Sequence, residues 1–254
     1  MKRLKAGRLK LISARSNARF RSRYPDEPMP PLDLMVDAHA HASYQEYWDS
    51  GTSIAAVLVE LFMMHHEPNG SAPIRILEWG CGSGRVLRHL RRVHAPGTAV
   101  LHGSDYNPTS IDWCRQTYRD IGFSKNEVAP PLPLADHSVD FTYAISVLTH
   151  LPDDLCRAWM AELNRVTRPG GLILFTTGGW PFRTRYRSKE QAAYRRGEPI
   201  YRGWDEVGRR DFFAWHPPQY VRQVFLAGLR EIEHFPAGTH HELQDFWLAR
   251  TSRA

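Results

Sequence analysis

Three closely spaced glycines between an apolar run and a helical segment form the pattern most suggestive of chemistry. Gly80, Gly82 and Gly84 directly follow the apolar residues 73–79. Because glycine has no Cβ, the backbone at these positions can approach a ligand closely, and the first amide groups of the following helix point at the same place. The pattern predicts a ligand-binding loop at the end of a strand.

The spacing of the glycines separates this loop from two other nucleotide-binding loops. The dinucleotide fingerprint needs a glycine where Arg85 stands, and a P-loop needs a Gly-Lys-Ser or Gly-Lys-Thr sequence that does not follow here. Sites for NAD and for the phosphates of ATP are therefore disfavoured.

Strand and helix patterns alternate along the chain around this loop. Apolar runs predict strands at residues 73–79, 98–105, 140–148 and 172–177. Apolar residues at helical spacing predict helices at residues 45–66, 86–93, 108–118 and 153–166. For the third helix, Asn107 is the expected N-cap and Pro108 the first helical residue. This alternation predicts a doubly wound α/β fold with helices on both faces of the sheet.

The segment around the glycines resembles the first motif of class I S-adenosylmethionine-dependent methyltransferases. Residues 76–84 read Ile-Leu-Glu-Trp-Gly-Cys-Gly-Ser-Gly, in which an acid precedes the three glycines. Further blocks similar to that family follow in its order: Asp105 and residues 131–140, 148–151 and 163–174, with a weaker similarity at residues 242–247. A lone glycine pattern would be weak evidence, whereas the ordered blocks extend the resemblance over about residues 74–177.

The resemblance implies a fold, a cofactor and a set of contacts. The fold is a Rossmann-like, seven-stranded, mostly parallel sheet with a closing antiparallel hairpin, and the cofactor is S-adenosyl-L-methionine. Asp105 would accept hydrogen bonds from both ribose hydroxyls, and Asn126 stands where the family commonly has an acid beside the adenine. The implied cofactor contacts are Glu78, Gly80, Cys81, Gly82, Gly84, Asp105, Tyr106, Asn126, Glu127, Ala144 and Ile145.

A histidine follows the central strand at the edge of the sheet where ligands bind in open α/β folds. His150 is the candidate catalytic residue, as a general base that takes the proton of an acceptor hydroxyl. The alternative is a histidine that caps the next turn or lines the cofactor pocket. Should His150 not act, positioning of the reactants alone, His216 or Tyr220 would have to carry the reaction.

The segment after the last parallel strand is rich in aromatic and basic residues. Residues 180–220 hold nine Lys or Arg residues against five acids, and ten aromatic residues: Trp180, Phe182, Tyr186, Tyr194, Tyr201, Trp204, Phe212, Phe213, Trp215 and Tyr220. Aromatic faces stack on sugar rings or bases, and arginines pair with phosphates or carboxylates. We expect residues 178–220 to cover the acceptor, an oxygen-bearing small molecule or a glycan or sugar intermediate, although some rings will pack the cover onto the core.

The positive charge of the chain lies at one end. The formal net charge is +6, but residues 1–23 carry nine Lys or Arg residues and no acid, which leaves 24 basic and 27 acidic residues, a charge of −3, for the rest. That sign makes nucleic acid an unlikely partner of the whole surface. We expect residues 1–31 to be a disordered basic tail and proline-rich linker; contact with an anionic membrane or a partner, and an organelle transit segment, are the alternatives.

Residues 32–70 are expected to form a helical lid, and residues 71–254 the methyltransferase domain. Within the lid, residues 37–41 read Asp-Ala-His-Ala-His and resemble the metal-binding first strand of amidohydrolases. That fold is a barrel of about 250 residues, and the motif lies too early to share the chain with a second α/β domain. We therefore expect a lid segment and no metal.

The cysteines and the hydropathy pattern bear on location. Cys81, Cys114 and Cys156 are odd in number and lack the close spacing of a zinc or redox site, which fits a reducing, cytoplasmic environment. The apolar stretch at residues 54–64 is interrupted by Glu60, so no membrane span is expected.

A nucleic-acid methyltransferase and a cofactor-fold scaffold without turnover are the alternative functions, and the oligomeric state stays open.

Overall fold

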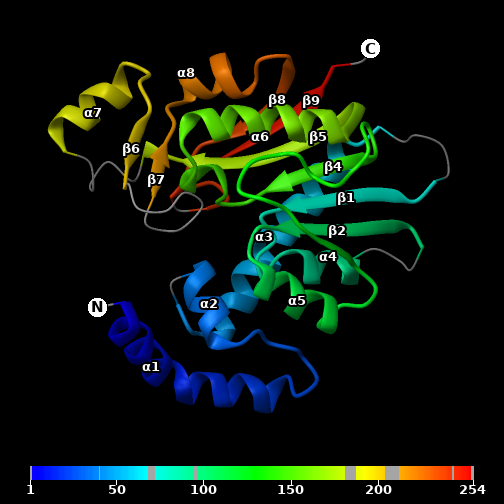
Figure 1. Cartoon of the computed structure of the whole chain (residues 1–254), viewed down its shortest axis with the longest axis vertical. Coiled ribbons are helices and arrows are strands. Elements are labelled where there is room, and N and C mark those ends of the chain that lie inside the picture. Colours follow the sequence, from blue (N-terminus) through cyan, green and yellow to red (C-terminus); the bar gives the residue numbers. More distant parts are fainter. Residues whose placement is uncertain are drawn as a thin grey trace.

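The computed structural model describes residues 2–39, 41–67, 72–93, 97–180, 187–203, 212–241 and 243–252. A seven-stranded sheet runs through the chain in the order β3-β2-β1-β4-β5-β9-β8 (Figure 1). Its strands are β1 Ile74–Trp79, β2 Ala99–Asp105, β3 Gly122–Lys125, β4 Val139–Ala144, β5 Thr167–Gly178, β8 Leu229–Phe235 and β9 Gln244–Thr251. The first five strands pair in parallel, and β9 pairs antiparallel with both β5 and β8. The predicted doubly wound fold with a closing hairpin is confirmed.

The central strands are apolar on both sides because helices cover both faces of the sheet. Alternate side chains enter two separate cores: Ile76 joins one and Leu77 the other, and Leu174 and Phe175 divide in the same way. A strand buried on both faces reads as a continuous apolar run, which is why residues 73–79 and 172–177 stood out in the sequence.

The helices divide between the faces. One core packs under α3 Tyr44–His65, α4 Leu87–Val93 and α5 Pro108–Thr117, and the other under α6 Asp153–Val166 and η3 Val221–Phe225. Asn107 caps α5 as expected, because its side-chain oxygen accepts from the amides of Thr109 and Ser110 at 3.0 and 3.2 Å. Among the described residues, no helix is both long and apolar enough to cross a membrane.

The fourth parallel strand is shorter than the sequence predicts. β4 ends at Ala144 instead of continuing to residue 148, and residues 148–150 form the short helix η1 Leu148–His150. Ser146 has a φ of 63°, a left-handed conformation that interrupts the strand, and its amide donates to the Thr176 hydroxyl at 2.8 Å. This turn brings the residues after β4 across the edge of the sheet.

The N-terminal tail is a helix, which corrects the expectation of a disordered arm. α1 Lys2–Arg23 packs against α3, and the short helix α2 Leu32–His39 lies between them in the chain (Figure 1). The Asn17 side chain donates to the Ala42 carbonyl at 2.7 Å and accepts from the Tyr44 amide at 2.8 Å. Phe20 is buried among aromatic rings, including Tyr44 and Trp48. Composition missed this docking because individual contacts, such as those of Asn17 and Phe20, carry it, and not a periodic apolar stripe.

The segment between β5 and β8 forms a small layer of its own. It contains α7 Ser188–Arg195, β6 Ile200–Arg202, β7 Phe213–Trp215 and α8 Pro218–Tyr220, with β6 and β7 paired antiparallel. A Cβ on Gly178 would lie 2.4 Å from the ring of Trp215, so the layer packs directly on the end of β5. Phe182, Tyr186 and Trp204 lie outside the described residues.

Replacing Asn17 by alanine tests the docking of α1. The substitution leaves the Tyr44 amide without its acceptor, and we expect it to lower the opening free energy of α1 by about 1–3 kcal/mol. Hydrogen exchange of amides in α1 and at the start of α3 measures this. Ser16→Ala on the exposed side of the same helix is the control and should change exchange little. Unchanged exchange in Asn17→Ala would mean that α1 is not held by this residue.

Candidate functional site

The three glycines form a loop that only glycine adopts without strain. Gly80, Gly82 and Gly84 have φ values of 77°, 51° and 72°, all in the left-handed region. The amides of Gly80 and Cys81 donate to the Ser104 carbonyl at 2.7 and 3.0 Å, so the loop is tied to the end of β2. These bonds place the loop at the carboxyl edge of the sheet.

Asp105 joins the glycine loop to the start of α5. One carboxylate oxygen accepts from the Gly82 amide and the other from the Asn107 amide, both at 2.8 Å. The side chain is buried, and burial raises the pKa of its carboxyl although these amide bonds act in the opposite direction. Each oxygen of a carboxylate can accept a second hydrogen bond, so Asp105 can also receive donors from a ligand.

Glu78 is the last residue but one of β1, just before the loop. One of its carboxylate oxygens accepts from the Leu87 amide at 3.1 Å and from the Tyr143 hydroxyl at 3.0 Å. Burial raises the pKa of Glu78 to about 8. The group therefore favours its protonated form at neutral pH, and a cation nearby would favour the charged form.

Asn126 and Glu127 point in different directions. The Asn126 oxygen accepts from the Ser104 hydroxyl at 2.7 Å, and its amide group donates to the Glu127 carbonyl at 2.7 Å. Glu127 is exposed and forms an ion pair with Lys125. Asn126 thus fastens β3 to β2 at the edge of the site, and a contact of either side chain with adenine stays a prediction.

The other predicted contacts lie in the loop itself or where β2 and β4 end. Burial raises the pKa of the Cys81 thiol well above its usual range, so it is neutral. Tyr106, between Asp105 and Asn107 in the chain, is half-buried, and Ala144 and Ile145 are buried where β4 ends. The sequence analysis missed Val147: a Cβ on Gly80 would lie 2.3 Å from a Val147 methyl group, so the turn after β4 closes on the loop.

The N-terminal segment lies against the same loop. The Tyr47 hydroxyl donates to the Ser83 carbonyl at 3.0 Å, and the Asn107 side chain donates to the Asp37 carboxylate at 3.5 Å. A Cβ on Gly82 would meet only the Cβ of Ala38, at 3.9 Å, among the described residues. Within the described part of the chain, the space beside Gly82 is thus bounded by α2 and is otherwise open.

The Asp-x-His-x-His motif forms part of this boundary. Asp37 and His39 lie in α2, a helix and not a strand. In the part of the chain that the structure describes, no group of three or more His, Cys, Asp or Glu side chains could hold a metal ion.

His150 is held in one tautomer by the backbone. Its Nδ1 lies 2.8 Å from the Phe212 carbonyl oxygen, which can only accept, so Nδ1 carries the proton. Nε2 of the neutral ring therefore carries the lone pair, which is the arrangement a general base needs. The catalytic role itself stays a prediction.

The two other candidate bases are less suited to proton transfer. His216 is fully buried among rings that include Tyr220, and burial lowers its pKa to about 3, so it stays neutral and binds protons weakly. The Tyr220 hydroxyl donates to Asp153. Burial raises the pKa of Tyr220 to about 12.

Comparison with known proteins identifies the domain that contains this loop. Residues 77–175 match the family model described as a methyltransferase domain. The chain contains a class I S-adenosylmethionine-dependent methyltransferase domain. S-adenosylmethionine is accordingly its cofactor.

Relatives of the methyltransferase domain differ in what their names say they methylate. The chain is 30% identical over 155 residues to a malonyl-[acyl-carrier protein] O-methyltransferase of Yersinia pestis, a match that covers 59% of this chain and 53% of that protein. It is 27% identical over 133 residues to the tRNA N(3)-cytidine methyltransferase METTL2 of Danio rerio, covering 48% and 36%. The matches thus span about half or less of these relatives.

A solved structure shares the fold. The 1,6-didemethyltoxoflavin-N1-methyltransferase of Burkholderia thailandensis, with bound 1,6-didemethyltoxoflavin and S-adenosylhomocysteine, aligns with a TM-score of 0.58. The alignment covers 89% of this chain and 93% of that chain at 13% identity. At this identity the likeness concerns the fold alone.

The residues of the loop fit the cofactor of this family. The open side of Gly82 leaves room that any larger side chain would occupy, and the Asp105 carboxylate retains acceptor capacity for ribose hydroxyls. Glu78 supplies a buried carboxyl group whose charged form a sulfonium or ammonium group would stabilise. The methyltransferase domain can hold S-adenosylmethionine with its own residues.

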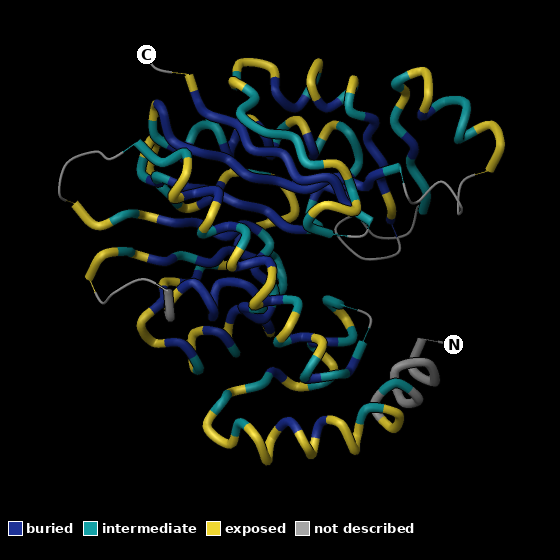
Figure 2. Tube along the Cα trace, turned by 180° about the vertical axis from the view of Figure 1, so that it is seen from behind, coloured by how far each residue is buried: buried dark blue, intermediate teal, exposed yellow. Residues whose placement is uncertain are grey.

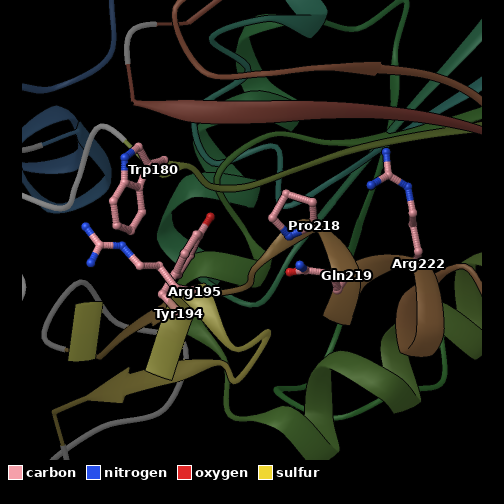
Figure 3. Close-up of a pocket in the computed structure, with 6 residues that line it drawn as sticks. All are labelled: Trp180, Tyr194, Arg195, Pro218, Gln219 and Arg222. Carbon is pink, nitrogen blue, oxygen red and sulfur yellow. The ribbon is translucent and has the colours of Figure 1, made fainter. Parts of the chain in front are cut away.

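A cavity of about 580 Å³ lies in the layer after β5. Figure 3 shows its lining: Trp180, Tyr194, Arg195, Pro218, Gln219 and Arg222. The Arg195 guanidinium lies 5.3 Å from the centre of the Trp180 ring. Arg222 is engaged by Glu231 in two bonds of 2.9 Å. A second cavity of about 630 Å³ lies between α7 and β6 and includes Arg187, Lys189 and Tyr201 in its lining.

Asp105→Asn tests the cofactor contact. The amide keeps the size of the side chain but removes its charge and half of its acceptor capacity, so we expect cofactor affinity to fall by about 1.5–3 kcal/mol. Calorimetric titration with S-adenosylhomocysteine measures the change. The matched control is Asp112→Asn on the exposed side of α5. Equal affinities of wild type and Asp105→Asn would remove Asp105 from the site.

Glu78→Gln tests the raised pKa. A carboxyl whose pKa rises from 4.5 to about 8 on folding contributes most stability below pH 4.5, and the contribution is lost as pH rises towards 8. Wild type without cofactor should therefore lose stability relative to Glu78→Gln between about pH 5 and pH 9, as urea unfolding would show. Glu60→Gln, at an exposed position, should follow wild type. If the free energies of unfolding of wild type and Glu78→Gln changed in parallel with pH, the raised pKa of Glu78 would be contradicted.

Proposed function

We propose that the protein transfers the methyl group of S-adenosylmethionine to an oxygen atom of a small molecule or a glycan or sugar intermediate. The observation that carries the proposal is the cavity lined by Trp180 and Arg195. Trp180 follows β5 after one intervening residue, and β5 is parallel to β4, which is parallel to β1. The cavity and the glycine loop therefore belong to the same edge of the sheet.

The cavity lining favours an acceptor with a flat or apolar part and a negative group. Trp180 and Tyr194 offer aromatic faces, and the Arg195 guanidinium lies over the Trp180 ring, where it can still donate to an anion from its edge. Aromatic faces also suit sugar rings. A relative named as an O-methyltransferase supports oxygen as the methylated atom.

Different residues of this chain have different roles in the proposed methyl transfer. The bound cofactor supplies a methyl group on a positively charged sulfur. A nucleophilic oxygen bonds to the methyl carbon as the carbon–sulfur bond breaks, and the sulfur leaves as a neutral thioether. The glycine loop and Asp105 orient the cofactor, α2 restricts access of water beside Gly82, and Nε2 of His150 takes the proton that the acceptor oxygen loses. An acceptor that is already an anion would need no such base.

A nucleic-acid acceptor is the second candidate because one relative is named as a tRNA methyltransferase. Against it, residues 146–149 read Ser-Val-Leu-Thr where base amino methyltransferases have Asn/Asp-Pro-Pro-Tyr/Phe. The net charge of −3 outside residues 1–23 also disfavours a large nucleic-acid surface.

An isotope experiment tests the proposal. The protein is incubated with methyl-labelled S-adenosylmethionine and either a small-molecule extract or total RNA. Label in small molecules supports oxygen methylation if mild alkali releases it, as expected for a methyl ester, or if hydriodic acid releases it as iodomethane, as expected for a methyl ether. Label in RNA alone, or cofactor binding without transfer to either fraction, contradicts it.

His150→Ala and Arg195→Gln should separate chemistry from recognition once an acceptor is in hand. Loss of the base should lower kcat about 10²- to 10⁴-fold with unchanged cofactor affinity. Loss of the guanidinium should mainly raise the KM of an anionic acceptor, and Arg230→Gln, at an exposed position on β8, is the control. Near wild-type kcat in His150→Ala from about pH 6 to pH 9 would exclude the base role.

A further inference from the structure

The outward side of α1 combines exposed apolar and basic residues. Leu11 and Ile12 are 80% and 69% exposed, the largest exposures among the large apolar side chains described. Arg15 and Arg19 follow at helical spacing and are also exposed. In the part of the chain that the structure describes, neither arginine forms an ion pair with an acid.

The other side of α1 is fastened to the protein. Asn17 and Phe20 are buried against the start of α3, and the Arg21 guanidinium donates to the Tyr44 hydroxyl at 2.8 Å. The outward side is thus presented on a preformed helix, so a partner would not have to order it. Figures 1 and 2 show α1 at the end of the molecule opposite β8 and β9.

Positive and negative charges are also separated along the chain. Residues 1–23 contain nine basic residues and no acid, whereas the remainder carries a formal charge of −3. An anionic surface would attract α1 and repel much of the rest. Association would therefore be oriented with α1 towards that surface.

We propose that the outward side of α1 binds an anionic lipid surface. The arginines would pair with lipid phosphates, while Leu11 and Ile12 enter the boundary between headgroups and acyl chains. A phosphodiester backbone would use the arginines but would leave both apolar side chains in water. Two adjacent, highly exposed apolar residues therefore favour lipid over nucleic acid.

Vesicle binding of the full chain tests the proposal. We expect sedimentation with phosphatidylcholine vesicles that contain about 30% phosphatidylglycerol, at least about tenfold weaker binding to pure phosphatidylcholine, and weakening by salt. Arg15→Glu/Arg19→Glu should lower binding to the anionic vesicles at least about tenfold. Leu11→Ser/Ile12→Ser, which leaves the charge unchanged, should also lower it, by on the order of tenfold.

The control places the same charge change elsewhere. Arg75→Glu/Arg230→Glu alters exposed positions on β1 and β8 and should bind anionic vesicles within about twofold of wild type. Circular dichroism checks that each variant keeps its helices. Three results would overturn the proposal: no binding of wild type to the vesicles, unchanged binding in Leu11→Ser/Ile12→Ser, or a loss of binding in the control pair as large as that in Arg15→Glu/Arg19→Glu. Binding to a transfer-RNA-sized RNA that exceeds vesicle binding and ignores the apolar pair would also overturn it.

Discussion

The Asp105 carboxylate holds together the parts on which the site depends. Its two oxygens accept one amide from the glycine loop and one from the residue that caps α5, so β2, the loop and the helix share one buried charge. The backbone between Gly80 and Gly84 has left-handed conformations that other residues would resist. The shape of the glycine loop therefore depends on one side chain and three residues without side chains.

The N-terminal segment extends this arrangement and borders the glycine loop. Arg88, at the start of α4, is buried and forms a 3.1 Å ion pair with Glu27, while its guanidinium also lies over the rings of Tyr47 and Tyr118. Removing either partner would leave a buried charge uncompensated, which is the costly way to lose such a pair. Through this pair and the Tyr47 hydroxyl, residues 27–47 are positioned by the elements that shape the glycine loop.

The layer after β5 meets the site through backbone contacts. Phe212 supplies the carbonyl that sets the proton on His150, and β7 packs beside the end of β5 through Trp215. A movement of this layer would change both the cavity beside Trp180 and the hydrogen bond that fixes the His150 tautomer. The cavity proposed for the acceptor and the residue proposed as the base thus belong to one structural unit.

The sequence by itself determined the sheet, the glycine loop and the acid that ends β2. These features depend on local patterns: apolar runs buried on both faces, glycines at positive φ, and Asn107 beside Pro108 at a helix start. The family resemblance added the order of the blocks and the cofactor. Even here the sequence misplaced the end of β4, because a non-glycine residue at positive φ is not visible in an apolar run.

Only the tertiary structure decided the state of the basic tail and the use of individual polar groups. Docking of α1 depends on contacts of Asn17 with residues 25 and 27 positions away, which no local pattern reports. The same holds for Asn126, whose side-chain oxygen accepts from the Ser104 hydroxyl, and for His150, which lies 62 residues before Phe212. Hydrogen bonds between distant segments form only because the fold brings those segments together. Burial in the folded protein then determines which titratable side chains keep their usual pKa.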